Sequence, residues 1–224
     1  MTAMAETKPE SGGPGELAGW ISPKRAALCV IDVQVDFAAP DGLMASYGVE
    51  MSAVPGAIAN MKRLVASARG AGVPVIFIGL ETKAETDSPV WMERMRRRDG
   101  DPESESNVCR AGTPGAAFYG PLPQPGDTVV MKPKYSAFHA TNFAEILMEK
   151  GVDTLVVCGL TTECCIDNTV SDAFHRDYHI IIADDASAAY GDDVHRSALN
   201  ILEMNCAVLR STAEIEDAWS AAHV

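Results

Sequence analysis

The chain has 224 residues, of which 47% are hydrophobic and only 6% aromatic, and its formal net charge at pH 7 is −13. This length suits one α/β domain with short tails, and an acidic chain is a poor partner for nucleic acid because phosphate binding requires a basic face. No apolar run approaches the ~20 residues that span a bilayer, so we expect no membrane partner.

The N-terminal residues 1–16 are polar and rich in Gly, Pro and Glu, and they contain no hydrophobic signal core. We therefore expect residues 1–20 to be a disordered tail, residues 21–224 to form a single domain, and the protein to be cytoplasmic. The six cysteines show neither CxxC pairs nor the spacing of a secreted domain. Cys29, Cys158 and Cys206 fall in apolar runs, which predicts buried reduced thiols.

The first predicted strand lies in the apolar run 26–33, which has a lone acid, Asp32, at its exit. A carboxylate at the end of a buried strand is costly unless another group pairs with it, and open α/β sheets bind their ligands at this end of the strands. Asp32 is therefore a catalytic candidate, with a capping or structural role as the alternative. An amphipathic helix is predicted over residues 54–71 and a second buried strand over residues 73–80.

A long irregular region follows over residues 81–125, with many Pro, Gly and charged residues and at most a short helix over residues 91–98. Such a loop inside a compact domain is usually functional, for example as a lid or a subunit contact. The basic cluster 94–98 is followed by four acidic residues, and we interpret it as a solvated or pocket-edge element.

The second half of the chain alternates further strands and helices. A third strand over residues 127–132 ends at Lys132, and a helix over 142–150 has Thr141 as its expected N-cap. Strands over 179–184 and 207–210 alternate with helices over 193–204 and 212–222, the last capped by Thr212. This alternation predicts an open parallel sheet with helices on both faces, a Rossmann-like three-layer α/β fold.

The most informative segment is a predicted strand, turn and helix around Cys165. The strand covers residues 154–158 and ends at Gly159, and Thr162 is the expected N-cap of a helix over residues 164–176. Cys165 then lies in the first helical turn, where the helix dipole and free N–H groups favour a thiolate and could bind an oxyanion. A free cysteine is often only a core residue, and we interpret Cys164 in that way.

Asp32, Lys132 and Cys165 all lie at the carboxyl ends of predicted parallel strands, so they can converge at one edge of the sheet. Cys165 could attack a carbonyl carbon while Asp32 takes its proton and returns it to a leaving amine. Lys132 could stabilise negative charge and influence both pKa values. The sequence therefore predicts a cysteine nucleophile with an acid–base partner.

These residues lie in segments that resemble a known family. Residues 32–37, 130–138 and 159–166 are similar to the three motifs of the isochorismatase-like cysteine hydrolases, and the resemblance extends over residues 26–210. It implies a six-stranded parallel sheet and a catalytic triad of Asp32, Lys132 and Cys165. It also implies a cis peptide bond between Leu160 and Thr161, with the amides of Thr161 and Cys165 forming the oxyanion hole.

The resemblance also bears on the substrate. Isochorismatases proper lack the nucleophilic cysteine, so Cys165 favours an amidase. Nicotinamidases often bind a metal through an Asp-x-His pair after the second strand, but residues 81–84 contain no histidine. We therefore expect no metal and no cofactor, and we disfavour nicotinamide. The segments around Lys132 and Cys165 look closer to the branches that hydrolyse carbamoyl and ureide compounds, and such proteins usually form dimers or tetramers.

Three other functions stay open. The alternatives are a nicotinamidase-type or other small-amide hydrolase, a catalytically silent binding protein, and a thiol redox protein using Cys164 and Cys165. The last is disfavoured because adjacent cysteines form strained disulfides. The expected substrate-binding residues are Gln34, Phe37, Trp91, Phe138 and Glu163.

Overall fold

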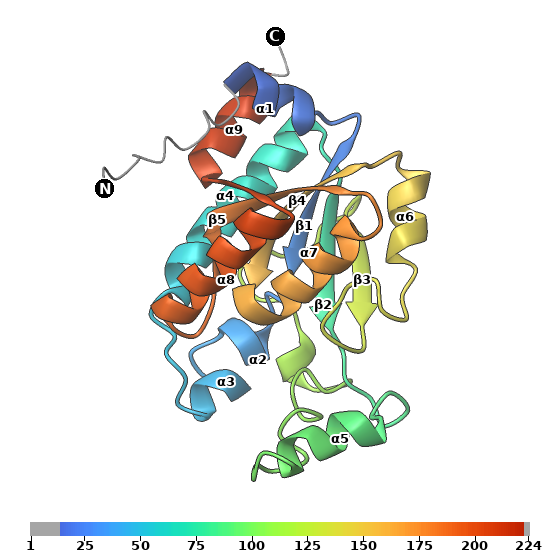
Figure 1. The fold of residues 1–224 in the computed structure, drawn as a ribbon, viewed down its shortest axis with the longest axis vertical. Coiled ribbons are helices and arrows are strands. Elements are labelled where there is room, and N and C mark those ends of the chain that lie inside the picture. Colours follow the sequence, from blue (N-terminus) through green and yellow to red (C-terminus); the bar gives the residue numbers. More distant parts are fainter. Residues whose placement is uncertain (1–13, 222–224) are drawn as a thin grey trace, which may run out of the picture.

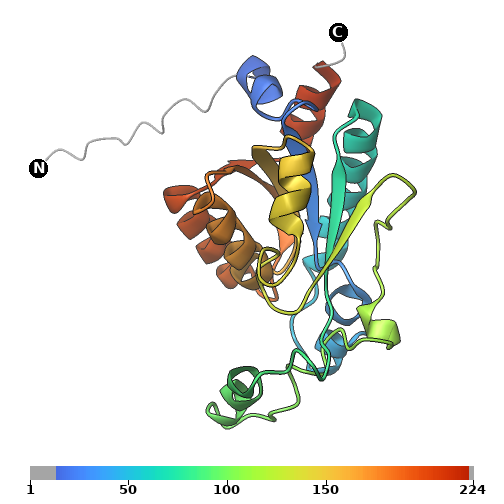
Figure 2. The same cartoon turned by 90° about the vertical axis from the view of Figure 1, so that its right-hand side faces the viewer.

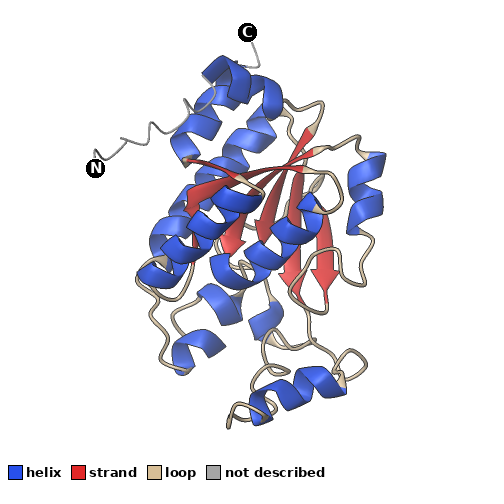
Figure 3. Cartoon of the chain, in the orientation of Figure 1, coloured by secondary structure: helices blue, strands red, loops and turns tan. Residues whose placement is uncertain are grey.

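The computed structural model describes residues 14–221, and its centre is one sheet of six parallel strands (Figures 1 and 3). The strands lie side by side in the order β3-β2-β1-β4-β5-β6. The predicted parallel α/β fold is therefore confirmed. The strands are β1 (Ala26–Ile31), β2 (Val75–Leu80), β3 (Thr128–Lys132), β4 (Thr154–Leu160), β5 (His179–Ala188) and β6 (Val208–Arg210).

The strand order determines where a ligand can bind. From β1 the chain first adds β2 and β3 on one side and then continues with β4, β5 and β6 on the other. The order thus reverses between β1 and β4, and open α/β sheets bind ligands in the crevice beyond the carboxyl ends of such a pair. Every residue of β1, β2 and β4 is buried, as expected for strands covered on both faces.

Helices cover both faces of the sheet, which gives three layers; in Figure 2 the α4 helix and the α7–α8 pair lie on opposite sides of the strands. Each face has its own apolar core cluster. One face is covered by α1 (Pro14–Trp20), α4 (Val54–Ala71) and α9 (Thr212–Ala221), and the other by α6 (Phe143–Glu149), α7 (Asp167–Phe174) and α8 (Asp192–Asn205).

The N-terminal segment differs from the prediction. Residues 14–20, expected to be part of a disordered tail, form α1, and residues 1–13 lie outside the described part of the chain. Leu17 and Ile21 are spaced by one helical turn and are both buried. The indole N–H of Trp219 donates to the Ile21 carbonyl at 2.9 Å, which ties this segment to α9. The predicted tail is therefore wrong for residues 14–20.

One predicted helix cap is wrong by one residue, and a second lies one residue before the N-cap position although its hydroxyl makes the capping hydrogen bond. The N-cap of α9 is Ser211, whose hydroxyl accepts from the Glu214 amide at 3.3 Å while the Glu214 carboxylate accepts from the Ser211 amide at 2.8 Å. Thr212 instead donates its hydroxyl to Asp185 at 2.6 Å. Asn142 occupies the N-cap position of α6, although the Thr141 hydroxyl accepts from the Phe143 amide at 3.2 Å.

Short helices lie beyond the carboxyl ends of the strands, in the lower part of Figure 1. The short helix predicted over residues 91–98 is α5, which starts two residues earlier because Ser88 caps it and Pro89 suits its first turn. No helix in the described range is long and apolar enough to cross a membrane. The short helices are α2 (Val35–Ala38), α3 (Leu43–Ser46), α5 (Pro89–Arg96) and the 3₁₀ turn η1 (Pro114–Ala116).

Candidate active site

Asp32 follows β1 directly and is fully buried. Its φ of 52° is in the left-handed region, which aspartate tolerates better than most residues, and its amide donates to the Ile78 carbonyl at 2.8 Å. One carboxylate oxygen, Oδ2, accepts from Lys132 at 2.7 Å. The other, Oδ1, is buried and has no hydrogen-bond partner among residues 14–221. A buried acceptor without a partner is costly, so this oxygen is available to a thiol or a substrate.

Lys132 is the last residue of β3 and its side chain is fully buried. Its ammonium group donates to Asp32 Oδ2 at 2.7 Å, to the Lys134 carbonyl at 2.9 Å and to the Cys165 sulfur at 3.4 Å. These contacts use all three N–H groups, as a buried ammonium requires. Lys132 therefore connects the predicted acid–base residue to the predicted nucleophile, and we call Asp32, Lys132 and Cys165 the Asp–Lys–Cys cluster.

The backbone that positions Cys165 differs from the prediction. Strand β4 continues through Gly159 to Leu160, and a π-helical turn, Thr162–Ile166, precedes α7. Gly159 has a φ of 132°, and a β-carbon there would lie 2.1 Å from the Ile31 carbonyl oxygen, so only glycine fits. The Leu160–Thr161 peptide bond is cis. Thr162 does not cap a helix; its hydroxyl lies 2.8 Å from the His195 Nδ1 atom.

The electrostatics of the Asp–Lys–Cys cluster favour a neutral thiol. A hydrogen bond with Cys164, burial and the nearby Asp32 carboxylate raise the pKa of Cys165, although Lys132 opposes them. Burial also raises the pKa of Asp32 against the effect of Lys132. Burial alone would lower the pKa of Lys132, but its anionic neighbours raise it to about 12. These effects oppose the expected resting thiolate, so the nucleophile requires a base.

A pocket of about 740 Å³ opens beside Cys165, and we call it the Cys165 pocket. The predicted substrate contacts Phe37, Trp91 and Glu163 line it, as does Thr161. Cys164, interpreted as a core residue, is only partly buried: it packs against one core cluster and also lines this pocket. The remaining lining residues are Met44, Tyr47, Leu80, Arg94, Met95, Arg98, Asp101, Ser104, Glu105, Val108, Tyr135 and Tyr190.

Gln34 and Phe138, also predicted to contact substrate, do not line this pocket. Gln34 is fully buried; its amide nitrogen donates to the Leu80 and Ala116 carbonyls, both at 2.8 Å, and its oxygen accepts from the Leu80 amide at 2.7 Å. Both of its N–H groups are thus used by the backbone. Phe138 packs in the core, with its ring 4.7 Å from that of Phe143. Both residues therefore support the loops around the site.

The wall formed by α5 was only partly predicted. Trp91 packs against Tyr135 with ring centroids 5.2 Å apart, and the Tyr135 hydroxyl donates to Glu105 at 3.1 Å. Glu105 also forms an ion pair with Arg94. The four arginines of the predicted basic cluster have two different environments. Arg94 and Arg98 line the Cys165 pocket. Arg96 and Arg97 form ion pairs with Glu93 of α5.

Several residues of the site gave no recognisable signal in the sequence. His195 on α8 contacts the turn that carries Cys165, and the Tyr190 hydroxyl donates to the Phe37 carbonyl at 2.7 Å. Tyr190 follows the end of β5 by two residues and lines the Cys165 pocket. Tyr135 was within a motif segment and could have been predicted from it, but Glu105 lies in the irregular region.

The segment after β2 was expected to lack metal ligands. Glu81 forms an ion pair with Lys83, and the Thr82 hydroxyl donates to the Ser106 carbonyl. Within the described part of the chain, no group of three or more His, Cys, Asp or Glu side chains could ligate a metal.

Chelation is expected to leave turnover unchanged, because in the predicted mechanism Cys165 is the nucleophile, Asp32 the base and Lys132 the positive charge. The measurement is the rate of amide hydrolysis after dialysis against EDTA, compared with a sample dialysed against buffer alone. Loss of turnover in EDTA, restored by zinc or iron, would contradict this prediction.

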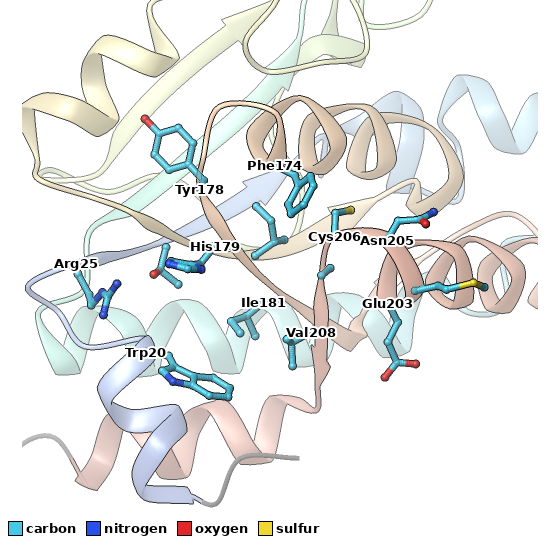
Figure 4. Close-up of a pocket in the computed structure, with 14 residues that line it drawn as sticks. Trp20, Arg25, Phe174, Tyr178, His179, Ile181, Glu203, Asn205, Cys206 and Val208 are labelled. Atoms are coloured by element: carbon cyan, nitrogen blue, oxygen red, sulfur yellow. The ribbon is translucent and has the colours of Figure 1, made fainter. Parts of the chain in front are cut away.

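A second pocket, of about 630 Å³, lies at the opposite ends of the strands (Figure 4). Its wall includes Trp20 of α1, Ile181 of β5, Val208 of β6 and Phe174 of α7. The Asp–Lys–Cys cluster does not contribute to it. The chemistry predicted from the sequence thus belongs to the Cys165 pocket alone.

A three-layer α/β fold with a buried Asp–Lys–Cys cluster beyond the carboxyl ends of its strands defines a cysteine hydrolase. Comparison with known proteins identifies the family. The isochorismatase domain matches residues 26–214, so the chain belongs to the isochorismatase family.

Relatives and solved structures agree with this assignment. The ureidoacrylate amidohydrolase RutB of Methylobacterium radiotolerans is 34% identical over 211 residues, which cover 88% of this chain and 81% of that protein. A cysteine hydrolase structure from Pseudomonas syringae pv. phaseolicola superposes with a TM-score of 0.80 at 28% identity, covering 96% of this chain and 99% of the other. The N-carbamoylsarcosine amidase of Thermoplasma acidophilum gives a TM-score of 0.67 at 25% identity, covering 84% and 96%.

Proposed function

We propose that the protein is a cysteine-dependent amidohydrolase that cleaves a C–N bond of a small carbamoyl or ureide compound. The observation that carries the proposal is the contact of Lys132 with both Asp32 and Cys165 in a buried site that opens into the Cys165 pocket. Buried charged groups are costly unless they are paired, and here they surround a thiol at a ligand-binding edge of the sheet. This arrangement speaks against a catalytically silent binding protein.

In the first half of the reaction, the Cys165 sulfur attacks the carbonyl carbon and its proton passes to Asp32, whose raised pKa suits proton transfer. Lys132 stays protonated and compensates the negative charge that develops. The carbonyl oxygen becomes an oxyanion, to which we assign the backbone amides of Thr161 and Cys165 as donors. The C–N bond then breaks, Asp32 returns the proton to the leaving nitrogen, and a thioester-type intermediate remains.

In the second half, Asp32 takes a proton from a water molecule, which attacks the same carbon. The C–S bond breaks and the proton returns to the sulfur, so Cys165 and Asp32 regain their starting states. For a ureide the net reaction consumes one water and releases ammonia with an N-substituted carbamate, or an amine with carbamate. No redox change is involved.

The substrate class is supported by the polarity of the Cys165 pocket and by the relatives. Ureidoacrylate amidohydrolase and N-carbamoylsarcosine amidase, to which this chain is similar, are named for substrates that contain a carbamoyl nitrogen. A ureide presents several N–H donors and one carbonyl acceptor, and Glu105 and Glu163 offer acceptors in the pocket. A site built to hydrogen-bond such groups rejects molecules that lack them.

We therefore expect faster turnover of a ureide than of nicotinamide, whose flat aromatic ring offers one amide and few N–H donors. The measurement is ammonia release in parallel assays with ureidoacrylate, N-carbamoylsarcosine and nicotinamide at equal concentrations. Faster release from nicotinamide would refute the substrate class and leave the cysteine mechanism standing. Assembly into a dimer or tetramer is part of the same proposal, and the mass in solution tests it.

A further inference from the structure

Two arginines line the Cys165 pocket in a chain that has 31 acidic and only 18 basic residues. Both come from the α5 segment: Arg94 lies within the helix, and Arg98 follows one turn later. The other arginines of this cluster form ion pairs with Glu93 and are exposed. The mechanism proposed above uses neither Arg94 nor Arg98, so their place in the wall of the pocket requires a separate explanation.

The side chain of Arg94 is held in one orientation but retains free donors. Its Nη1 atom forms an ion pair with Glu105, which also accepts from the Tyr135 hydroxyl at 3.1 Å. The Arg94 side chain is 39% exposed, and its Nε and Nη2 atoms have no partner among the described residues. A guanidinium group fixed on one edge with the other edge free can bind a planar anion through two parallel hydrogen bonds.

We propose that Arg94 binds the carboxylate of an anionic ureide, so that the substrate is a ureido acid with its carbamoyl group directed to Cys165. This inference rests on the function proposed above and names the substrate class of the same pocket. Arg98, whose side chain has no hydrogen bond or ion pair within residues 14–221, adds a second positive charge to the wall. Ureidoacrylate and N-carbamoylsarcosine, for which the relatives are named, are both carboxylic acids.

The acidic groups of the pocket are compatible with an anion at Arg94. Glu105 forms an ion pair with Arg94 and accepts from the Tyr135 hydroxyl, and Asp101, a further acid of the wall, accepts from the Glu103 amide at 3.0 Å. Glu163 lies two residues before Cys165 and lines the same pocket, so it offers an acceptor to the N–H groups of a ureide bound at the thiol. A ureido acid carries N–H donors at one end and a carboxylate at the other, which matches a pocket with acceptors near the thiol and a cation on α5.

The experiment compares 3-ureidopropionate with propylurea, which has the same ureide group and chain length but no carboxylate. Arg94→Gln should lower kcat/KM for 3-ureidopropionate about 10- to 100-fold, mainly through KM, because a charged hydrogen bond made equally in substrate and transition state is lost. Turnover of propylurea should change by less than about twofold. Arg94→Lys should lower kcat/KM for 3-ureidopropionate less than Arg94→Gln does, since lysine keeps the charge but not the paired donors. Arg97→Gln is the matched control on the same segment and should leave both substrates unchanged.

Binding to the Cys165→Ala variant, measured by calorimetry, separates this inference from the proposed reaction. If the wild-type protein hydrolyses neither probe, the proposed function fails for these compounds, but weaker binding of 3-ureidopropionate after adding Arg94→Gln would still support the carboxylate site. Equal losses for both probes would show that Arg94 only supports α5 and would overturn the proposal. The proposal would also be overturned if Arg94→Gln left binding of 3-ureidopropionate undiminished, or if only Arg98→Gln weakened that binding.

Discussion

Replacing Cys165 by alanine is expected to abolish turnover, with a loss of at least about 10⁴-fold in kcat, because no other group can form the covalent intermediate. The fold should stay intact. Cys165 is small, and the Lys132 ammonium that it contacts at 3.4 Å keeps its other two acceptors, Asp32 and the Lys134 carbonyl. The measurements are ammonia release and the thermal unfolding midpoint of the purified variant.

Cys164→Ala is the matched control, and it should retain most of the activity. Cys164 lines the same pocket, yet it has no hydrogen bond to Asp32 or Lys132. Because the hydrogen bond with Cys164 raises the pKa of Cys165, its removal should shift alkylation of Cys165 by iodoacetamide to lower pH. If Cys164→Ala abolished turnover while Cys165→Ala retained it, the nucleophile would have been assigned to the wrong thiol.

The strands and the Asp–Lys–Cys cluster could be predicted because each rests on a local pattern. β1, β2 and β4 are continuous apolar runs bounded by polar or glycine residues, which is typical of strands buried on both faces. In a parallel sheet the residues that follow such strands must meet at one edge. Asp32, Lys132 and Cys165 therefore converge although 133 positions separate the first from the last, as their numbers 32 and 165 show.

The details that were wrong depend on contacts between distant segments. Gln34 follows Asp32 by two positions, but its side chain bonds the backbone at Leu80 and Ala116, which no local pattern reveals. Thr162 has the right residue type for an N-cap, yet His195 from α8 competes for its hydroxyl. The thiolate expected from helix position alone is opposed by Cys164, burial and Asp32, which raise the pKa of Cys165. Sequence patterns thus located the site, while its electrostatics required the folded structure.

Asp32→Asn is expected to lower kcat by about 10³-fold or more, because an amide can neither accept the thiol proton nor return it to the leaving nitrogen. Asparagine keeps the shape of the side chain and also tolerates the left-handed backbone at this position. It does remove the counter-charge of a buried ammonium, which typically costs ~3–5 kcal/mol of stability. The assay must therefore be run well below the unfolding midpoint of the variant, and Lys132→Met, which removes the opposite partner of the pair, should be measured beside it.

The pH dependence provides the sharper test of the role of Asp32. The carboxylate must be ionised to act as the base, and burial raises its pKa, so wild-type kcat/KM should fall on acidification at a pH above the ordinary aspartate value of about 3.9. In Asp32→Asn this acidic limb should disappear. Its residual rate should instead rise with pH as Cys165, whose pKa is also raised, loses its proton to solvent. An Asp32→Asn protein that keeps more than about a tenth of the wild-type kcat, with an unchanged acidic limb, would show that another group is the base.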